Sequence, residues 1–163
     1  MPWHRDEYND VLAGAGHDAH CSVQINLTDA NAQNCVAVIP GSHRWDDAEL
    51  ARRGFVAGSR GDRSNTPDYT TDRVPESVDI HLAAGEFYVF HPRLLHASML
   101  RGSADRGAPD GDGSTRYSIT LRIAAAGVKV LPAAFAGTPT RAACVVLSGS
   151  DAGGGNEIGS WAA

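Results

Sequence analysis

The chain has 163 residues and a formal net charge of −5 at pH 7; 42% of its residues are hydrophobic and 7% are aromatic. The surplus of acidic side chains argues against nonspecific binding of nucleic acid, which depends on Lys and Arg neutralising phosphates. We expect no membrane partner either, because the best candidate span, residues 119–137, is interrupted by Arg122, Lys129 and Pro132. The length suits one globular domain, and 18 glycines with 8 prolines favour a fold rich in loops.

Alternation of polar and apolar residues, the pattern of half-buried strands, is the strongest local signal. The expected strands cover residues 22–28, 35–39, 78–82, 87–90 and 116–123. Turn residues separate them, as Pro40-Gly41 does after the second. Short strands separated by turns predict an all-β sandwich or barrel. Strand parity also places Gln24 and Asn26 on one face, where we expect them to line a cavity.

Two polar segments, residues 44–77 and 101–115, interrupt this pattern. The first is expected to hold a short helix near residues 46–53, capped by Asp46 or Asp47, followed by a loop. The second is a long Gly/Asp-rich loop, of the kind that is usually functional or disordered. After residue 126 the pattern weakens, and only residues 143–147 suggest another strand. We therefore expect a core over 1–126 and an extension over 127–163 with a flexible, Gly-rich tail.

The cysteines and the amino end bear on the compartment. Cys21, Cys35 and Cys144 form no paired framework, and a chain of this size needs no disulfide to fold. The opening residues hold no apolar stretch of the kind that directs secretion. We therefore expect a reduced, cytoplasmic protein.

His4 is the most informative of the seven histidines, because Asp6 follows it two positions later. On an extended segment both side chains point to the same side, so the two could bind one metal ion together. A second histidine from a distant strand would complete a set of two histidines and one carboxylate, which is diagnostic of non-haem Fe(II) oxygenases. Taken alone, the two residues could equally be a surface pair near the chain end.

The surroundings of this pair resemble a known family. Trp3-His4-Arg5-Asp6 is followed, in order, by Pro40-Gly41-Ser42-His43, Gly85-Glu86, His96-Ala97-Ser98 and Arg116. Over roughly residues 2–124 this ordered set resembles the phytanoyl-CoA dioxygenase family of Fe(II)/2-oxoglutarate-dependent oxygenases. The resemblance implies a mainly β fold, a double-stranded β-helix (jelly-roll, cupin-like) barrel with one short helix and long loops.

The resemblance also implies a role for each matching residue. His4 and Asp6 match the proximal iron ligands, and His96 matches the distal one. Arg116 matches the arginine that binds the far carboxylate of 2-oxoglutarate, and Ser98 matches the hydroxyl that assists it. A guanidinium suits that task because it offers a carboxylate two parallel, charge-assisted hydrogen bonds. Arg122 lies further along the same expected strand and is the weaker candidate.

The implied activity is that of a dioxygenase which uses O2 and decarboxylates 2-oxoglutarate to succinate and CO2 while it oxidises a small molecule. Asp6 favours hydroxylation, because related halogenases carry a small residue in its place. Family members usually have a long segment before the His-x-Asp motif, so the chain is expected to be truncated. A second copy could then cover the exposed edge of the barrel.

Two other functions fit the same residues. A truncated β-barrel could keep the motifs and serve as a non-catalytic binding or scaffold module, or a cupin-like metal enzyme could work without 2-oxoglutarate and without Arg116. Other histidines are interpreted structurally: His43 as part of a tight turn, and His81 and His91 as strand residues with hydrogen-bond partners. His17, His20 and Cys21 could contribute to a zinc site, although no second Cys/His pair lies nearby in the sequence.

Overall fold

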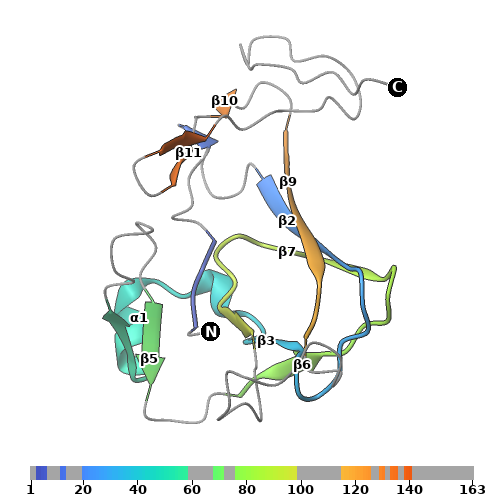
Figure 1. Ribbon diagram of the computed structural model, residues 1–163. Coiled ribbons are helices and arrows are strands. Elements are labelled where there is room, and N and C mark those ends of the chain that lie inside the picture. The colour runs from blue at the N-terminus through green and yellow to red at the C-terminus, as the bar shows by residue number, and fades with distance from the viewer. Residues whose placement is uncertain are drawn as a thin grey trace.

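The fold is mainly β. The computed structural model describes residues 3–6, 20–58, 68–71, 76–98 and 115–125, together with the short strands β1 (Leu12–Ala13), β10 (Lys129–Val130), β11 (Ala133–Phe135) and β12 (Thr138–Thr140) (Figure 1). Within these residues the helical elements are a 3-10 turn, η2 (Ser42–Arg44), and one α-helix, α1 (Asp47–Arg52). No helix in this described part is long and apolar enough to cross a bilayer.

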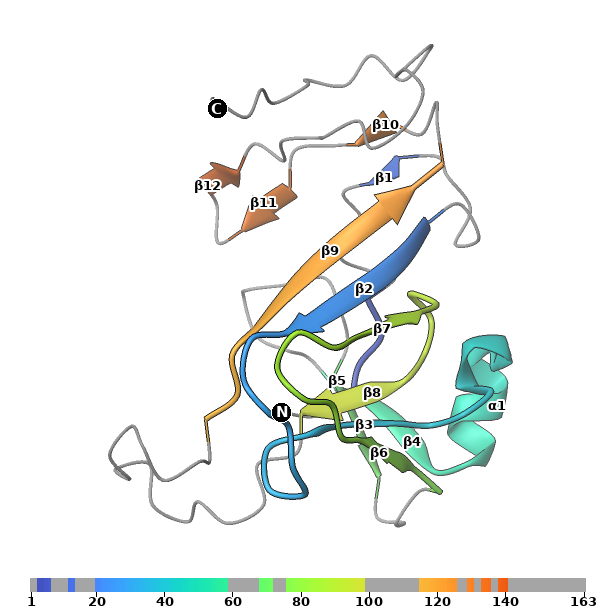
Figure 2. The same ribbon diagram turned by 90° about the vertical axis from the view of Figure 1, so that its right-hand side faces the viewer.

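Two three-stranded antiparallel sheets form the centre of the molecule. The first sheet has the order β7 (Phe87–Phe90), β2 (His20–Asn26), β9 (Ser118–Ala124). The second has the order β6 (Val78–Ile80), β3 (Val36–Val38), β8 (His96–Ser98). Figure 2 shows the first sheet above the second. Strands that are distant in the sequence lie side by side in both sheets, which is the arrangement of the predicted double-stranded β-helix.

The inner face of the first sheet is polar. Ser22, Gln24 and Asn26 alternate along β2 and are all buried. The register places Ser22 between Phe90 and Arg122 on the neighbouring strands. Gln24 and Asn26 are therefore buried on the same face, and their expected place in the lining of a cavity stays a prediction. Because buried polar side chains need partners, such an interior is suited to holding a polar ligand.

The outer face of the same sheet is apolar and open to solvent. Its register brings Ile25 between Phe87 and Ile119, and Val23 between Val89 and Leu121. The exposed members are 39–61% accessible, and they are Phe87, Val89, Tyr117, Ile119, Leu121 and Ile123. We call these six residues the outer apolar face. Contiguous apolar surface of this kind usually marks a contact site or a tendency to associate.

A buried hydrophobic core cluster joins the second sheet to a hairpin made of β4 (Phe55–Gly58) and β5 (Asp68–Thr71). The cluster contains Ile39, Leu50, Phe55, Tyr69 and Leu95, with Trp3 and Trp45 packed against it. The helix expected at residues 46–53 is confirmed as α1, but the loop expected after it is partly wrong, because β4 and β5 pair there. Each strand of the hairpin buries one aromatic side chain, Phe55 or Tyr69, which is too weak a pattern to stand out in the sequence.

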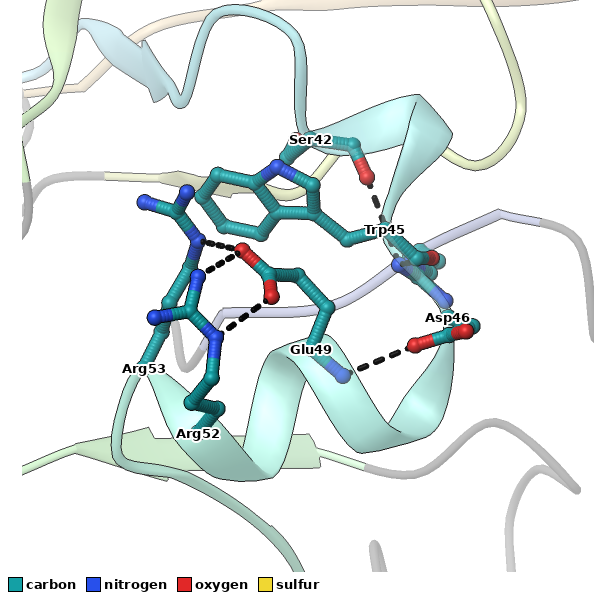
Figure 3. A network of polar contacts seen from close by, with 7 residues as sticks. Ser42, Trp45, Asp46, Glu49, Arg52 and Arg53 are labelled. Carbon is teal, nitrogen blue, oxygen red and sulfur yellow. Dashed lines mark hydrogen bonds and ion pairs between the residues drawn. The ribbon is translucent and has the colours of Figure 1, made fainter.

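Polar contacts define both ends of α1 (Figure 3). The Asp46 carboxylate caps the first turn by accepting a hydrogen bond of 2.8 Å from the backbone N–H of Glu49. The Glu49 carboxylate accepts from Arg52 and Arg53, and these bonds lower the pKa of Glu49 to about 2. The Arg53 guanidinium lies 4.0 Å from the centre of the Trp45 ring. Trp45 is thereby held beside the helix. Its backbone carbonyl accepts a hydrogen bond from Arg5, which lies in the site described below.

Past residue 125 the structure describes short strands only. β10 pairs with β1, and β11 pairs with β12. The weakening pattern after residue 126 indicated none of these pairings. The strand expected at 143–147 and the loop at 101–114 lie outside the described residues, and the division of the chain at residue 126 stays a prediction.

Candidate metal centre

The site begins with backbone pairing between the amino-terminal segment and β8. His4 and His96 are paired antiparallel, and each backbone N–H donates to the carbonyl of the other at 3.0 Å. Two residues on, the N–H of Asp6 donates to the carbonyl of Pro92 at 2.8 Å. On its other edge the segment pairs with β5 through Trp3 and Tyr69. Residues 3–6 are therefore held between two strands, which is what a precise ligand position requires.

This pairing brings the three predicted ligands together. His4, Asp6 and His96 are buried, with 4%, 7% and 7% of their surface exposed, and their potential ligand atoms all lie within 4.8 Å of one another. The ring centres of the two histidines are 4.2 Å apart. The set of two imidazoles and one carboxylate suits a divalent transition metal such as Fe(II), and these three residues would hold it.

The orientation of His96 supports this fit. Its Nδ1 lies 2.9 Å from the backbone carbonyl of Leu94, which can only accept a hydrogen bond, so Nδ1 carries the proton. In the neutral ring Nε2 then holds the lone pair, and it faces Oδ1 of Asp6 at 3.8 Å. That separation is long for a hydrogen bond but reasonable for two atoms that share a metal, each about 2 Å from the ion.

Arg5 explains why His4 and Asp6 both turn inward. It points to the opposite side of the extended segment and is completely buried. One of its terminal nitrogens donates to the carbonyls of Trp45 at 2.6 Å and Ser42 at 3.3 Å. The Ser42 hydroxyl in turn accepts from the N–H of Leu95, next to His96, at 2.9 Å. The turn at Ser42 therefore anchors both ligand-bearing segments.

His43 lies in this turn, as predicted. The turn follows Gly41, whose φ of 79° is in the left-handed region that favours glycine. The His43 ring packs 5.3 Å from that of His91. Partial burial, then the nearby His91, Arg44 and Arg93, lower the pKa of His43 below its ordinary value of 6.5.

Arg116 and Ser98, the predicted cosubstrate pair, also meet. The Nη2 of Arg116 lies 3.4 Å from the Ser98 hydroxyl, and its Nη1 lies 3.4 Å from that of Ser118. Its Nε donates to the carbonyl of Asn34 at 2.9 Å. The guanidinium is thus anchored through Nε, while its two terminal nitrogens, among the described residues, make only long contacts with hydroxyls.

Tyr88 and Gln24 extend this polar group, and Tyr88 was not singled out from the sequence. The Tyr88 hydroxyl donates to Gln24 at 2.6 Å, and the Gln24 amide donates to Ser118 at 3.0 Å. Burial raises the pKa of Tyr88 despite the opposing effect of Arg116, so its hydroxyl stays protonated and neutral. The sequence predicted a strand here because residues 87–90 are aromatic or β-branched. A run that is apolar throughout does not indicate which side chains point inward, so Tyr88 did not stand out.

Two further residues contact Asp6 itself. The Nη2 of Arg122 lies 3.0 Å from Asp6 Oδ2, and the hydroxyl of Ser22 donates to the same oxygen at 3.0 Å. From the sequence, Arg122 is the weaker cosubstrate candidate, and the pattern predicts no role for Ser22. The available signal was the parity of β9, which places Arg116 and Arg122 on one face of the strand.

One other group of described residues brings three potential metal ligands within 4.8 Å, namely Cys35, Asp79 and His81. Asp79 lies on the edge strand β6, whereas His81 follows the end of that strand and is exposed, so the expectation that His81 is a strand residue is wrong. His20 and Cys21, which the sequence offered as an alternative zinc site, belong to neither group, and His17 lies outside the described residues.

Comparisons with known proteins identify the family and the fold of the chain. The sequence model of the phytanoyl-CoA dioxygenase (PhyH) family matches residues 1–108. No curated protein matches the chain. Among solved structures, the apo form of the non-heme monooxygenase ThoJ has a TM-score of 0.56 at 21% identity, covering 94% of this chain and 48% of its own.

Two further structures show the same relation. The nickel complex of ThoJ has a TM-score of 0.55 at 19% identity, covering 97% of this chain and 47% of its own. The non-heme α-ketoglutarate-dependent epimerase SnoN from nogalamycin biosynthesis has a TM-score of 0.49 at 19% identity, covering 80% and 41%. The chain thus spans less than half the length of these structures. Because the family model matches well over half of its residues, the chain belongs to the phytanoyl-CoA dioxygenase family.

Proposed function

We propose that the chain is the core of an Fe(II)/2-oxoglutarate-dependent dioxygenase that hydroxylates a small molecule with O2. The observation that best supports this is the buried group of His4, Asp6 and His96. When bound there, Fe(II) would supply the redox chemistry that couples decarboxylation of 2-oxoglutarate to succinate and CO2 with oxidation of the substrate.

In this proposal the protein provides ligands and orientation. Asp6 Oδ1 and His96 Nε2 face each other, and His4 adds the third donor from the strand paired with β8. Backbone hydrogen bonds on both edges of residues 3–6 keep these donors in place. Pre-positioned donors matter because a ligand displaced by even 1 Å or so can cost much of the activity.

Arg116 and Ser98 would bind the far carboxylate of 2-oxoglutarate. The Arg116 terminal nitrogens make only 3.4 Å contacts with hydroxyls, which a carboxylate could replace with shorter, charge-assisted bonds. The neutral hydroxyl of Tyr88 lies in the same hydrogen-bonded group and adds no negative charge that would repel the anion. Because His96 and Ser98 are two apart on β8, one short strand would serve both the metal and the cosubstrate.

The comparisons support the fold of such an enzyme. ThoJ, which shares the fold, is named as a non-heme monooxygenase and has been solved with nickel. Hydroxylation, a small-molecule substrate, a cytoplasmic location and a homo-oligomer that covers the exposed edge of the barrel are parts of the proposal that rest on the sequence analysis above.

A second candidate, a non-catalytic module of a larger assembly, is favoured by one observation. The outer apolar face is a wide exposed surface on a chain that spans less than half the length of its structural neighbours. This candidate predicts binding to another polypeptide and no joint binding of Fe(II) and 2-oxoglutarate.

Anaerobic titration separates the two candidates. Adding Fe(II) and 2-oxoglutarate to the apo protein should produce a weak visible charge-transfer band that requires both at one site. His96→Ala should abolish the band, whereas His81→Ala, just past the edge strand β6 and outside this site, should retain it. A folded native chain without the band, or a band lost equally in both variants, would refute the dioxygenase proposal.

A further inference from the structure

The two carboxylate oxygens of Asp6 have different surroundings. Oδ1 faces His96 Nε2 at 3.8 Å, inside the proposed metal site. Oδ2 lies 3.0 Å from Arg122 Nη2 and accepts a hydrogen bond of 3.0 Å from the Ser22 hydroxyl. The carboxylate is therefore turned so that one oxygen is directed to the metal ligands and the other to two donors from the opposite sheet.

Both donors come from one place in that sheet. Ser22 on β2 and Arg122 on β9 are directly paired in the register of the two strands. Ser22 is completely buried, and three quarters of the Arg122 side chain is covered. A cross-strand pair in adjacent strands has little freedom to move apart, so the two donors form a fixed clamp on Oδ2. The positive charge of Arg122 also offsets the cost of burying the Asp6 carboxylate.

The number of carboxylate oxygens on a metal decides how many positions remain for other ligands. Carboxylates bind cations through one oxygen or through both. Two histidines and a one-oxygen carboxylate occupy one face of an octahedral ion and leave the other face open. A carboxylate bound through both oxygens would take one of the open positions, and a keto acid that binds through two atoms would have to compete for it.

We propose that Arg122 and Ser22 hold Asp6 as a one-oxygen metal ligand and thereby keep open the coordination position that 2-oxoglutarate needs. The inference rests on the proposed function, because it takes His4, Asp6 and His96 as the ligands. It makes Arg122 a positioning residue that acts through Asp6. It also separates the roles of the two arginines on β9: Arg116 faces the Ser98 hydroxyl, and Arg122 faces the ligand carboxylate.

The test compares metal binding with cosubstrate binding in Arg122→Met, which removes the donors and keeps most of the side-chain length. We expect Co(II) affinity within about threefold of the native value, an altered Co(II) absorption spectrum, and 2-oxoglutarate affinity of the metal-loaded protein reduced by about tenfold or more. Arg122→Lys should restore most of the cosubstrate affinity, because it returns a charged donor. Ser22→Ala should show a smaller change of the same kind.

Arg52→Met is the matched control. Arg52 also pairs with a carboxylate, that of Glu49 at 2.7 Å, but it lies on α1 in the network of Figure 3. Its replacement should change neither the spectrum nor either affinity. Thermal melting of every variant checks the fold. If Arg122→Met does not fold, Arg122→Lys and Ser22→Ala carry the comparison, and native values for Ser22→Ala would then overturn the inference.

The remaining outcomes separate the inference from the proposed function. If Arg122→Met has the same Co(II) spectrum and the same 2-oxoglutarate affinity as the native protein, the inference is wrong but the proposed function stands. The same holds if Arg122→Met loses Co(II) and 2-oxoglutarate affinity equally. A native protein that binds Co(II) but not 2-oxoglutarate would refute the proposed function; the Co(II) spectrum of Arg122→Met would then decide the inference, and an unchanged spectrum overturns it. A native protein that binds no Co(II) overturns both.

Discussion

Arg5 is predicted to contribute substantially to folding stability although it lies between two proposed metal ligands. Replacing it with Met keeps much of the buried side-chain volume but removes the bond of 2.6 Å to the Trp45 carbonyl and the longer bond of 3.3 Å to the Ser42 carbonyl. A hydrogen bond from a charged donor contributes roughly 1.5–3 kcal/mol, and the longer one should contribute less.

The two carbonyls would each keep one hydrogen-bond donor, which limits the loss of folding stability in Arg5→Met. The Trp45 carbonyl still accepts from Arg93 at 2.9 Å, and the Ser42 carbonyl still accepts from the Trp45 N–H at 3.1 Å. We therefore expect Arg5→Met to lower the free energy of unfolding by about 2–3 kcal/mol, rather than by the larger penalty of leaving buried carbonyls unpaired. For a chain of this size, that corresponds to a fall in melting temperature of about 4–12 °C.

Urea unfolding followed by circular dichroism measures this difference directly. Arg52→Met again serves as control, because an exposed ion pair contributes only about 0–1 kcal/mol. A metal ion that binds the folded state alone should recover part of the stability lost in Arg5→Met. A loss below about 0.5 kcal/mol, no larger than in the control, would refute the argument that the buried guanidinium anchors the ligand segment.

Three further predictions address cosubstrate binding, association and pH. Arg116→Met should weaken 2-oxoglutarate binding by about tenfold or more while leaving metal affinity unchanged, because it removes the charge-assisted bonds to the cosubstrate, and the contacts described above for Arg116 involve none of the proposed metal ligands; equilibrium dialysis would contradict this if both affinities fell together. Leu121→Lys, on the outer apolar face, should reduce self-association measured by light scattering with little change in melting temperature, and unchanged scattering would exclude that face as the cause. The pKa of His43 is lowered in the folded state, so its contribution to stability is present above pH 6.5 and is lost as the pH falls from 6.5 through the folded-state pKa. Urea unfolding at several pH values should therefore show that the free energy of unfolding falls less on acidification in His43→Gln than in the native chain. The same dependence on pH in both proteins would contradict this prediction.

Local pattern predicted the main strands because period-two alternation is a property of consecutive residues. It correctly placed the strand around Ser22–Asn26 and the long strand ending near Ile123. It missed the hairpin of β4 and β5, in which Phe55 and Tyr69 are the buried residues. Such a hairpin is stabilised by contacts with Leu50 and Ile39, which come from separate parts of the chain.

Some parts of the candidate site could likewise be predicted from the sequence, and others depend on the tertiary structure. From the order of its motifs alone, the sequence indicated the family, the trio of His4, Asp6 and His96, and the pairing of Ser98 with Arg116. The roles of His96, Ser98 and Arg116 came from the resemblance to the family. Strand geometry by itself supported only the pairs two residues apart, His4 with Asp6 and His96 with Ser98, since such side chains share a face. The clamp on Asp6 was beyond such reasoning. It depends on the alignment of β2 with β9, strands about a hundred residues apart, and on the contact of both with a segment that pairs with β8. Long-range register follows from packing of the whole barrel, so Arg122 acquired its partner only when the chain folded.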